Sequence, residues 1–411
     1  MPSDPTNPKR QALQVSTITS DAGFTGLHNA WNDLVRNHVS SNIFLSHEWF
    51  AATWAWRRQD STLCLQVAWR GGHTVGILPL IRKRNPQERC RRLELLTVVD
   101  TQVADLIAAP ADLAEITQAF AESLTMRRDW DILQLDYLLP EGAILRALVP
   151  SLARRGLRVQ VRDGRGNPFV ALDGTWKKYY DTRSRRLKKA NNLAANRMQK
   201  AGEVRIAWLR PDSCDESQIK HAIDVVIDIS RRSWKRETDY SLDQPGPQAF
   251  IRSLSQTAHE RGWLSIWLMY VGDQPLAMEY QLIDKGNVHA LRSDFDQSYE
   301  AISPGTHLFR QLLESSFGRG LKRYYMGPGD NPYKLRWTDQ SEGLRRVIVY
   351  NRTLRGRLAW LREAVAKPVF RALRDRFASP PKEVTKDGST AATRIGDGAS
   401  GVRSPQVDQH G

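Results

Sequence analysis

The sequence predicts a mixed α/β fold made of two similar lobes in tandem. Segments that alternate with the period of a strand take turns with amphipathic segments of helical period over residues 16–350. One hairpin pattern occurs twice, and the order of strands and helices around it repeats. The 411 residues are 41% hydrophobic and 26% charged, a globular balance that excludes collagen-like, coiled-coil and wholly disordered chains.

The first lobe is expected over residues 16–165. Its predicted elements are helices at 26–36 and 47–57, strands at 63–69, 74–80 and 93–99, a helix at 112–126 and a strand at 130–137. Asp112 is expected to cap the helix that it precedes. A Gly/Arg/Pro-rich segment at 163–168 indicates the boundary between the lobes.

The second lobe is expected over residues 166–350. It opens with a basic, weakly helical stretch, and a Ser-Pro-Gly segment later begins a helix. The predicted helices are 217–234, 247–261 and 303–317, and the predicted strands are 264–271, 276–283, 287–293 and 321–326.

The repeat is clearest at the first hairpin of each lobe. Residues 69–77 (WRGGHTVGI) align with residues 270–278 (YVGDQPLAM) at a constant offset of 201. In both, a strand ends on an aromatic residue, turns on glycine and resumes with a small residue between two apolar ones. The pattern favours a duplicated α/β unit over the alternative of two unrelated hairpins.

The net charge of +15 is concentrated in three segments, 82–92, 177–200 and 352–376. The middle one holds nine basic residues against Asp181 alone and adjoins Trp176, Tyr179 and Tyr180. Such local surpluses indicate anionic partners at defined places. The alternative is that each segment is simply a solvated face.

Several classes of protein do not fit the sequence. No apolar run approaches the length of a membrane span, and residues 1–10 lack the apolar core of a secretory signal. The three cysteines form no CxxC pair, and no histidines have ligand spacing around an acid. We expect a cytoplasmic protein without a metal or a permanently bound cofactor.

Two segments of the second lobe carry a resemblance to a known group. Residues 296–305 (DQSYEAISPG) and 329–337 (GDNPYKLRW) resemble bacterial acetyltransferases of the GNAT superfamily, grouped with CelD-type cellulose-biosynthesis proteins. That group is related to FemAB-like transferases. The basic residues around Arg183 and the Phe44–Trp49 segment also fit, whereas Tyr325 stands where the group often has an acid.

The resemblance implies a double acyl-CoA N-acyltransferase fold, in which an amine attacks the thioester of acetyl-CoA or another acyl-CoA directly. The coenzyme's pyrophosphate needs an anion site, and the start of a helix supplies one. We therefore place coenzyme binding at Ser303, Pro304, Gly305 and Thr306, with Lys334 neutralising a phosphate. The alternatives are an ordinary Pro-initiated helix and a Lys334–Asp330 pair. Because Asp112 would block the equivalent helix start, the first lobe is expected to lack a working copy.

Acyl transfer also needs a base for the amine and a donor for the leaving thiolate. Strand alternation places Glu279 on a small and polar face, so Glu279 is the candidate base, and a structural carboxylate is the alternative. Tyr333 and Asp330 are the further catalytic candidates near the same end of the sheet.

The C-terminal segment divides into two parts. Residues 351–378 are predicted to form a basic amphipathic helix, and residues 379–411, which lack aromatics, are predicted to be disordered. The helix could lie on an anionic membrane surface, which would make the protein peripheral at the inner membrane, or dock on the second lobe.

The main hypothesis is an acyl-CoA-dependent N-acyltransferase acting on an amine of a sugar, lipid precursor or small metabolite, with a link to polysaccharide or cell-envelope biosynthesis. One alternative is a FemAB-like transferase that uses aminoacyl-tRNA, for which the basic stretch 177–200 would hold the RNA. The other is a non-catalytic GNAT-like scaffold that binds nucleic acid or a membrane.

Overall fold

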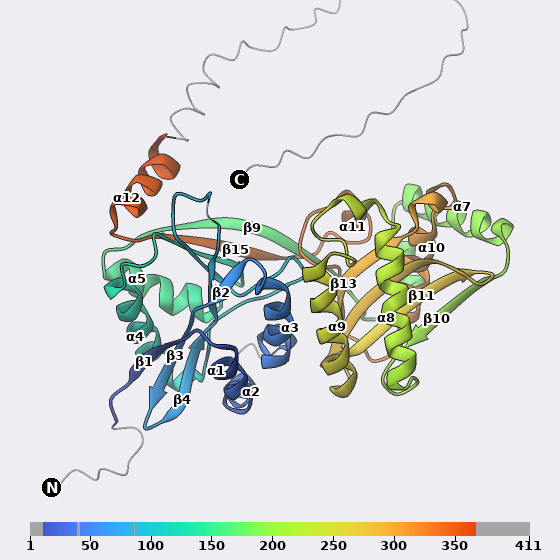
Figure 1. Cartoon of the computed structure of the whole chain (residues 1–411). Helices are drawn as coiled ribbons and strands as arrows, with labels where there is room; N and C mark the ends of the chain where they lie inside the picture. The colour runs from blue at the N-terminus through green and yellow to red at the C-terminus, as the bar shows by residue number, and fades with distance from the viewer. Residues whose placement is uncertain (1–10, 39–41, 86, 367–411) are drawn as a thin grey trace, which may run out of the picture. The chain divides into compact units, whose positions relative to one another are not determined.

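The computed structural model describes residues 11–38, 42–85 and 87–366, and the residues up to Arg362 form one compact unit. Two lobes lie side by side in that unit and are joined by two long strands (Figure 1). The first lobe consists of β1 (Gln14–Ile18), α1 (Asp21–Gly26), α2 (His28–Arg36), α3 (His47–Arg57), β2 (Ser61–Leu63), β3 (Leu65–Arg70), β4 (His73–Leu78), β5 (Leu80–Lys83), β6 (Arg92–Leu95), β7 (Ile107–Ala108), α4 (Leu113–Met126), β8 (Ile132–Leu138), α5 (Val149–Arg154) and β9 (Arg158–Ala171).

The second lobe repeats this order. It consists of α6 (Trp176–Asp181), α7 (Arg185–Ala201), β10 (Val204–Leu209), α8 (Glu216–Arg231), α9 (Pro245–Glu260), β11 (Leu264–Val271), β12 (Gln274–Asp284), β13 (Asn287–Phe295), α10 (Pro304–Ser316), β14 (Arg323–Tyr325), α11 (Pro332–Leu335) and β15 (Ser341–Tyr350). In each lobe one strand after the hairpin runs parallel to the strand after the following helix, β6 with β8 and β13 with β14. The predicted mixed α/β fold is confirmed.

The duplicated hairpin keeps its register residue for residue. Val67 pairs with Ile77 in the first lobe, and Leu268 pairs with Met278 in the second, each 201 positions later. The two hairpins also share a register shift at the same place, after Ala68 and after Met269. A shared bulge is a stronger sign of duplication than a shared turn, because bulges occupy specific positions in a fold.

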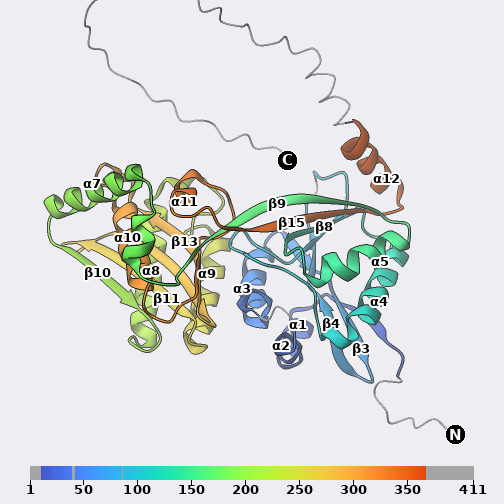
Figure 2. The ribbon, with the colours of Figure 1, turned by 180° about the vertical axis from the view of Figure 1, so that it is seen from behind.

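The sheets of the two lobes are joined through β9 and β15. The two strands pair with each other from Arg158 to Pro168, and β9 then pairs with β14 of the second lobe. β15 pairs in turn with β8 of the first lobe, which completes an eleven-stranded sheet. Both strands run across the molecule in Figure 1 and Figure 2.

The segment 163–168, expected to be a boundary loop, is the middle of β9. Its glycines serve close strand approach: a Cβ at Gly166 would stand 2.6 Å from Asp330 Oδ1, and one at Gly164 would stand 3.1 Å from the Leu344 backbone. The boundary expected between residues 165 and 166 therefore lies inside β9, a strand that follows the first lobe in the chain and pairs with β14 and β15 of the second.

One hydrophobic core extends across the two lobes. It packs α3 against α9, where the rings of Trp49 and Phe250 meet edge to face at 5.5 Å. Trp49 and Phe250 are both fully buried. Burying aromatic surface on this scale makes the contact between the lobes a permanent one.

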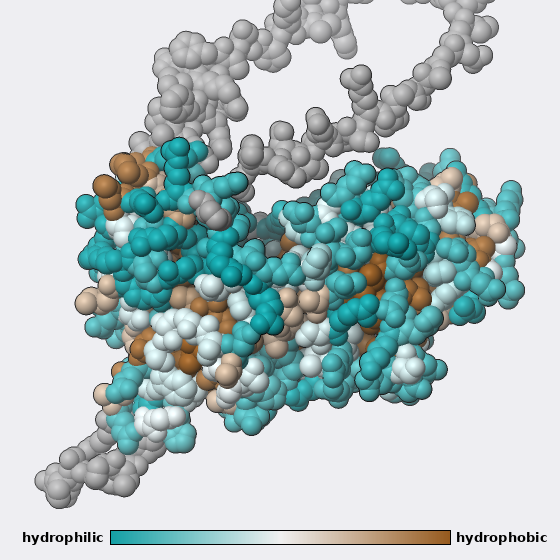
Figure 3. Space-filling model, in the orientation of Figure 1, coloured by the Kyte–Doolittle hydropathy of each residue, from teal (hydrophilic) through white to brown (hydrophobic). Residues whose placement is uncertain are grey.

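The C-terminal helix α12 (Leu354–Trp360) packs on the first lobe. Its Trp360 ring lies 3.5 Å from the Arg158 guanidinium, and Thr353 at its start donates to Asp131 at 2.7 Å. The alternative that this helix docks on the second lobe is wrong for the described residues, because α12 packs on the first lobe. The apolar stripe of Leu354, Leu358 and Leu361 is exposed. These residues give the brown surface beside α12 in Figure 3. Residues 367–411, which include the predicted tail, lie outside the described residues.

Within the described ranges, no helix combines the length and the apolar character needed to cross a membrane.

Candidate active site in the second lobe

A buried polar cluster lies on one face of the second-lobe sheet. The Tyr324 hydroxyl donates to Glu279 Oε1 at 2.9 Å and accepts from the Gln281 amide at 2.8 Å. Glu279 is 2% exposed and Tyr324 is fully buried. The strand alternation predicted this face for Glu279 and Gln281, and β12 confirms it, because Met278 and Tyr280 lie in the opposite core.

The first lobe has leucines at the same three positions. When the two hairpins are aligned by their register, Leu78 corresponds to Glu279 and Leu80 corresponds to Gln281. The parallel strand pairs place Leu133 at the position of Tyr324. All three leucines are fully buried in one core cluster. The fold therefore does not require polar groups here, and the second lobe carries them for another reason.

Burial raises the pKa of Glu279 to about 7, and hydrogen bonds from Ser293 and Tyr324 oppose this shift. Ser293 is exposed and pairs with Glu279 across β12 and β13, so its hydroxyl connects the buried carboxyl to the surface. A carboxyl group that titrates near neutral pH can take and release a proton under physiological conditions.

Further charged groups surround this carboxyl. Lys235 forms an ion pair with the buried Asp294 at 2.6 Å and donates to the Ser293 carbonyl at 3.2 Å. Tyr333 is 47% exposed, and partial desolvation of its hydroxyl, together with the charges of Glu279 and Asp294, raises the pKa of that hydroxyl. The raised pKa keeps the Tyr333 hydroxyl protonated, so that it can act as a donor.

Lys334 and Asp330 do not form the pair that the sequence allowed. The Lys334 ammonium donates to the carbonyls of Gly327 at 2.7 Å and Pro328 at 3.3 Å. Burial lowers the pKa of Lys334 to about 8. Asp330 is exposed and lies beside Gly166 of β9.

The start of α10 lies next to α7. Ser303 precedes the helix in the left-handed conformation, with φ of 57°, and Pro304 is its first residue. Gly305 lies against Phe295, whose ring carbon would stand 3.0 Å from a Cβ at this position. Arg197 of α7 donates to the Ala301 carbonyl at 2.9 Å, which brings a cation to the helix start. No acid stands in the first turn.

At the start of α4, the equivalent helix of the first lobe, two acids form ion pairs with one arginine. Asp112 does not cap α4 as expected, because its side chain instead accepts from Arg70 at 2.6 Å, and Arg70 also pairs with Glu115. The position of Arg70 in the repeat is held by Val271 in the second lobe. A buried arginine offers Asp112 a stronger, charge-assisted bond than a helix N–H does.

A loop of the first lobe extends to β13 of the second. Asp100 pairs with Arg292 at 2.7 Å, and both side chains are 4% exposed. Gln102 donates to the Ala290 carbonyl at 3.0 Å and hydrogen-bonds His289 at 2.9 Å. The two strands β13 and β14 pair only up to His289 and Tyr325, so Gln102 reaches β13 where it diverges from β14.

In the structure Glu279 thus lies in the buried cluster with its charge acting on Tyr333, Ser303–Thr306 lie at a helix start without an acid, and Asp330 lies beside Gly166. Sequence reasoning missed Tyr324, Ser293 and Lys235. The offset of 201 could have drawn attention to this cluster, because it aligns the polar Glu279 with the apolar Leu78. Within the described part of the chain, no group of His, Cys, Asp and Glu side chains is arranged to hold a metal ion.

Residues 184–335 match the family model described as an acetyltransferase (GNAT) domain. This range includes α7, β12, α10 and the Glu279 cluster. No curated protein matches the sequence.

Solved structures resemble the whole double lobe. FemX is 10% identical, with a TM-score of 0.51 over 88% of this chain and 99% of that one. A conserved protein of unknown function from Bacteroides thetaiotaomicron is 8% identical, with a TM-score of 0.50 over 82% and 100%. A tandem GNAT protein from the clavulanic acid biosynthesis pathway is 11% identical, with a TM-score of 0.41 over 82% and 98%.

At such low identities these likenesses concern the fold alone. The repeated hairpin register, the parallel strand pairs and the family match agree with one another. Residues 184–335, most of the second lobe, are therefore similar to an acetyltransferase (GNAT) domain, and the chain is an acyltransferase with a double GNAT-like fold.

Proposed function

We propose that the second lobe transfers an acyl group from acyl-CoA to an amine. The observation that carries this proposal is the Glu279–Tyr324–Gln281 cluster, which replaces three core leucines of the first lobe. Buried polar groups cost stability that leucines would supply, so a lobe that keeps them has a chemical use for them.

The reaction is a single displacement. The amine nitrogen forms a bond to the thioester carbon, the carbon–sulfur bond breaks, and the amine loses a proton. Glu279, with its pKa near 7, is the proposed base, and the exposed Ser293 hydroxyl passes the proton to it. The proposed proton donor to the leaving thiolate is Tyr333, whose pKa is raised. Asp330, beside Gly166, has no step in this scheme.

The start of α10 fits the coenzyme's pyrophosphate. Free N–H groups at Gly305 and Thr306, the helix dipole and the nearby Arg197 all favour an anion there. The absence of a side chain on Gly305 allows a phosphate to approach the backbone. Lys334 adds positive potential, although its own hydrogen bonds go to the Gly327 and Pro328 carbonyls.

The acceptor we propose is an amine on a sugar or a similar cell-envelope precursor, in keeping with a role in polysaccharide biosynthesis. Trp234 and Tyr240 are 59% and 49% exposed on the loop after α8. The loop is held over β13, because Lys235 pairs with Asp294 and the Tyr240 carbonyl accepts from Arg292 at 2.8 Å. Exposed aromatic faces suit a ring that is apolar on one side and polar at its edge.

Titration of the full chain with acetyl-CoA by calorimetry tests the coenzyme. We expect saturable binding, followed by thiol release when glucosamine is added. Absence of saturable binding would overturn the proposal. Binding that Ser303–Thr306 variants leave unchanged would overturn the assignment of the helix start.

A second candidate is aminoacyl transfer from tRNA. Exposed cations along α6 and α7 favour it: Lys177, Lys178, Arg185, Arg186 and Lys189 project from these helices. If RNA binds there, log affinity must fall linearly with log salt, by about 0.7–0.9 per phosphate neutralised. No RNA binding near physiological salt would remove this candidate.

A further inference from the structure

A second concave site lies in the first lobe, away from the Glu279 cluster. The sheet divides at Cys64: β2 ends at Leu63 and belongs to the eleven-stranded sheet, whereas β3 begins at Leu65 and belongs to the four-stranded sheet. A cavity of about 940 Å³ opens where the two sheets part, beside the segment that follows α4. Its size is that of a small-molecule site.

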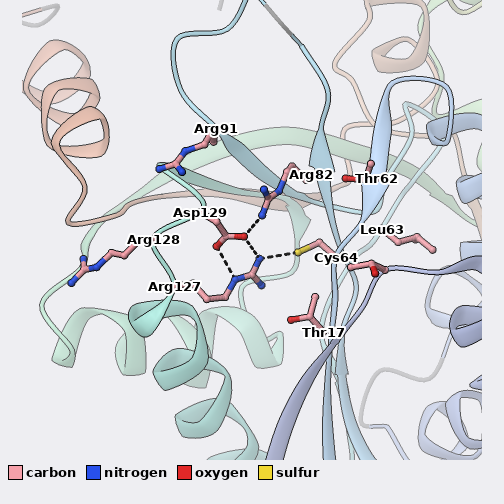
Figure 4. A pocket seen from close by; sticks show the side chains of 10 residues that line it. Thr17, Thr62, Leu63, Cys64, Arg82, Arg91, Arg127, Arg128 and Asp129 are labelled. Carbon is pink, nitrogen blue, oxygen red and sulfur yellow. Dashed lines mark hydrogen bonds and ion pairs between the residues drawn. The ribbon is translucent and has the colours of Figure 1, made fainter.

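Four arginines line this cavity (Figure 4), from two different parts of the chain: Arg82, Arg91, Arg127 and Arg128. The Asp129 carboxylate lies between Arg82 and Arg127, and the Arg127 guanidinium also contacts Cys64 Sγ at 3.2 Å. Arg91 is paired with the buried Asp131 at 2.9 Å. Arg128 is exposed and has no ion pair or side-chain hydrogen bond with the described residues.

The charges do not balance. The lining holds four arginines and one carboxylate, Asp129, while Arg91 is paired with Asp131 outside the lining; these six side chains together carry an excess of two positive charges. Purely structural arginines would be matched by acids or buried against carbonyls. An excess of two charges in a concave site is the complement of a dianion, and guanidinium groups bind phosphate oxygens in pairs.

The second lobe has no such site. At the position of Cys64 it carries Ser265, which accepts from the Trp208 indole at 2.9 Å, and the Trp208 and Trp267 rings stack at 4.7 Å. The position of Arg82 is held by Ile283. The arginine cavity is therefore specific to the lobe that lacks the polar cluster of the second.

We propose that the first lobe binds a ligand bearing a phosphate dianion, as a phosphomonoester or a diphosphate, in the cavity between β2, β5 and the segment 127–129. The guanidinium groups of Arg82, Arg127 and Arg128 bind its oxygens, and the exposed Thr62 is part of the lining. The site does not depend on acyl transfer in the second lobe.

The test is calorimetric titration of the full-length Gly305→Asp variant with inorganic pyrophosphate. The acid at the start of α10 repels an anion there, so the titration reports the cavity of the first lobe, and the variants below are made in this background. Because Arg128 is exposed, Arg128→Gln and Arg128→Glu should fold normally, as thermal denaturation can show. We expect the affinity to fall in that order, by at least about tenfold for the reversal of charge. Arg146→Glu, an exposed charge reversal on the same lobe but outside the cavity, is the matched control and should bind normally.

The origin of the phosphate is decided by a second measurement. Inhibition of acyl transfer by pyrophosphate, lost in Arg128→Glu, would indicate that the phosphate belongs to the acceptor. Unchanged transfer would indicate a separate ligand. The proposal is overturned if pyrophosphate does not bind saturably, or if both Arg128 variants bind it as tightly as the Arg146→Glu control does.

Discussion

The two lobes share a hairpin register, a bulge and a strand order, but they differ in what they bury. Where the first lobe has Leu78, Leu80 and Leu133, the second has Glu279, Gln281 and Tyr324. Where the first lobe closes its helix start with Arg70 and Asp112, the second leaves an uncharged turn. One backbone therefore supports either a stable core or a polar site, and the side chains decide which.

The largest expected effect comes from removing the carboxyl that distinguishes the second lobe from the first. Glu279→Gln should lower kcat for acyl transfer by about 10²–10⁴-fold, because the base is lost while the shape is kept. The KM for acetyl-CoA should change little. Steady-state kinetics check this, and Glu314→Gln on the surface of α10 is the control. Full activity in Glu279→Gln would make the carboxyl structural.

Breaking the contact between the lobes should cost the most stability. Asp100→Asn leaves Arg292 buried without its partner, and we expect a loss of about 3–5 kcal/mol in the free energy of unfolding. Urea denaturation measures it. Arg292→Met and the double variant complete a cycle, and strictly additive losses would show that the pair is not coupled.

The polar cluster should also make stability depend on pH. The pKa of Glu279 is about 7 in the folded chain against 4.5 for an unperturbed glutamate. Between these values the folded state binds more protons, so stability falls as pH rises from about 4.5 to about 7, by on the order of 3 kcal/mol. The free energy of unfolding of Glu279→Gln should therefore change less with pH across this range. Equal slopes in the two proteins would contradict the raised pKa.

The helix starts give the smallest expected effects. Gly305→Asp should weaken acetyl-CoA binding by at least about tenfold, because an acid there repels the phosphate. Gly305→Ala adds only a Cβ, which contacts Phe295, so this variant measures the steric part of the loss without the charge.

In the first lobe, Asp112→Ala should leave binding intact and cost about 1 kcal/mol of stability, through the lost bond to Arg70. Calorimetry and thermal denaturation measure the two quantities. If Asp112→Ala weakened binding as Gly305→Asp does, the first lobe would hold the coenzyme site.

Much of the fold follows from local pattern. The helix predicted at residues 47–57 and the strand predicted at 264–271 coincide with α3 and β11, because their amphipathic or apolar runs are long and end at clear signals. β9 did not follow from pattern: its arginines, glycines and asparagine resemble a loop, and only pairing with β14 and β15 makes it a strand.

The candidate site divides in the same way. The sequence by itself determined the duplication, the face of β12 that carries Glu279 and the helix start at Pro304, because period and offset are properties of the chain. Only the tertiary structure decided that Tyr324 and Ser293 hydrogen-bond that carboxyl, that Lys235 pairs with the neighbouring Asp294, and that Asp112 bonds Arg70 instead of capping α4. Contacts between side chains distant in sequence depend on how strands align and helices pack, and no local pattern encodes that alignment.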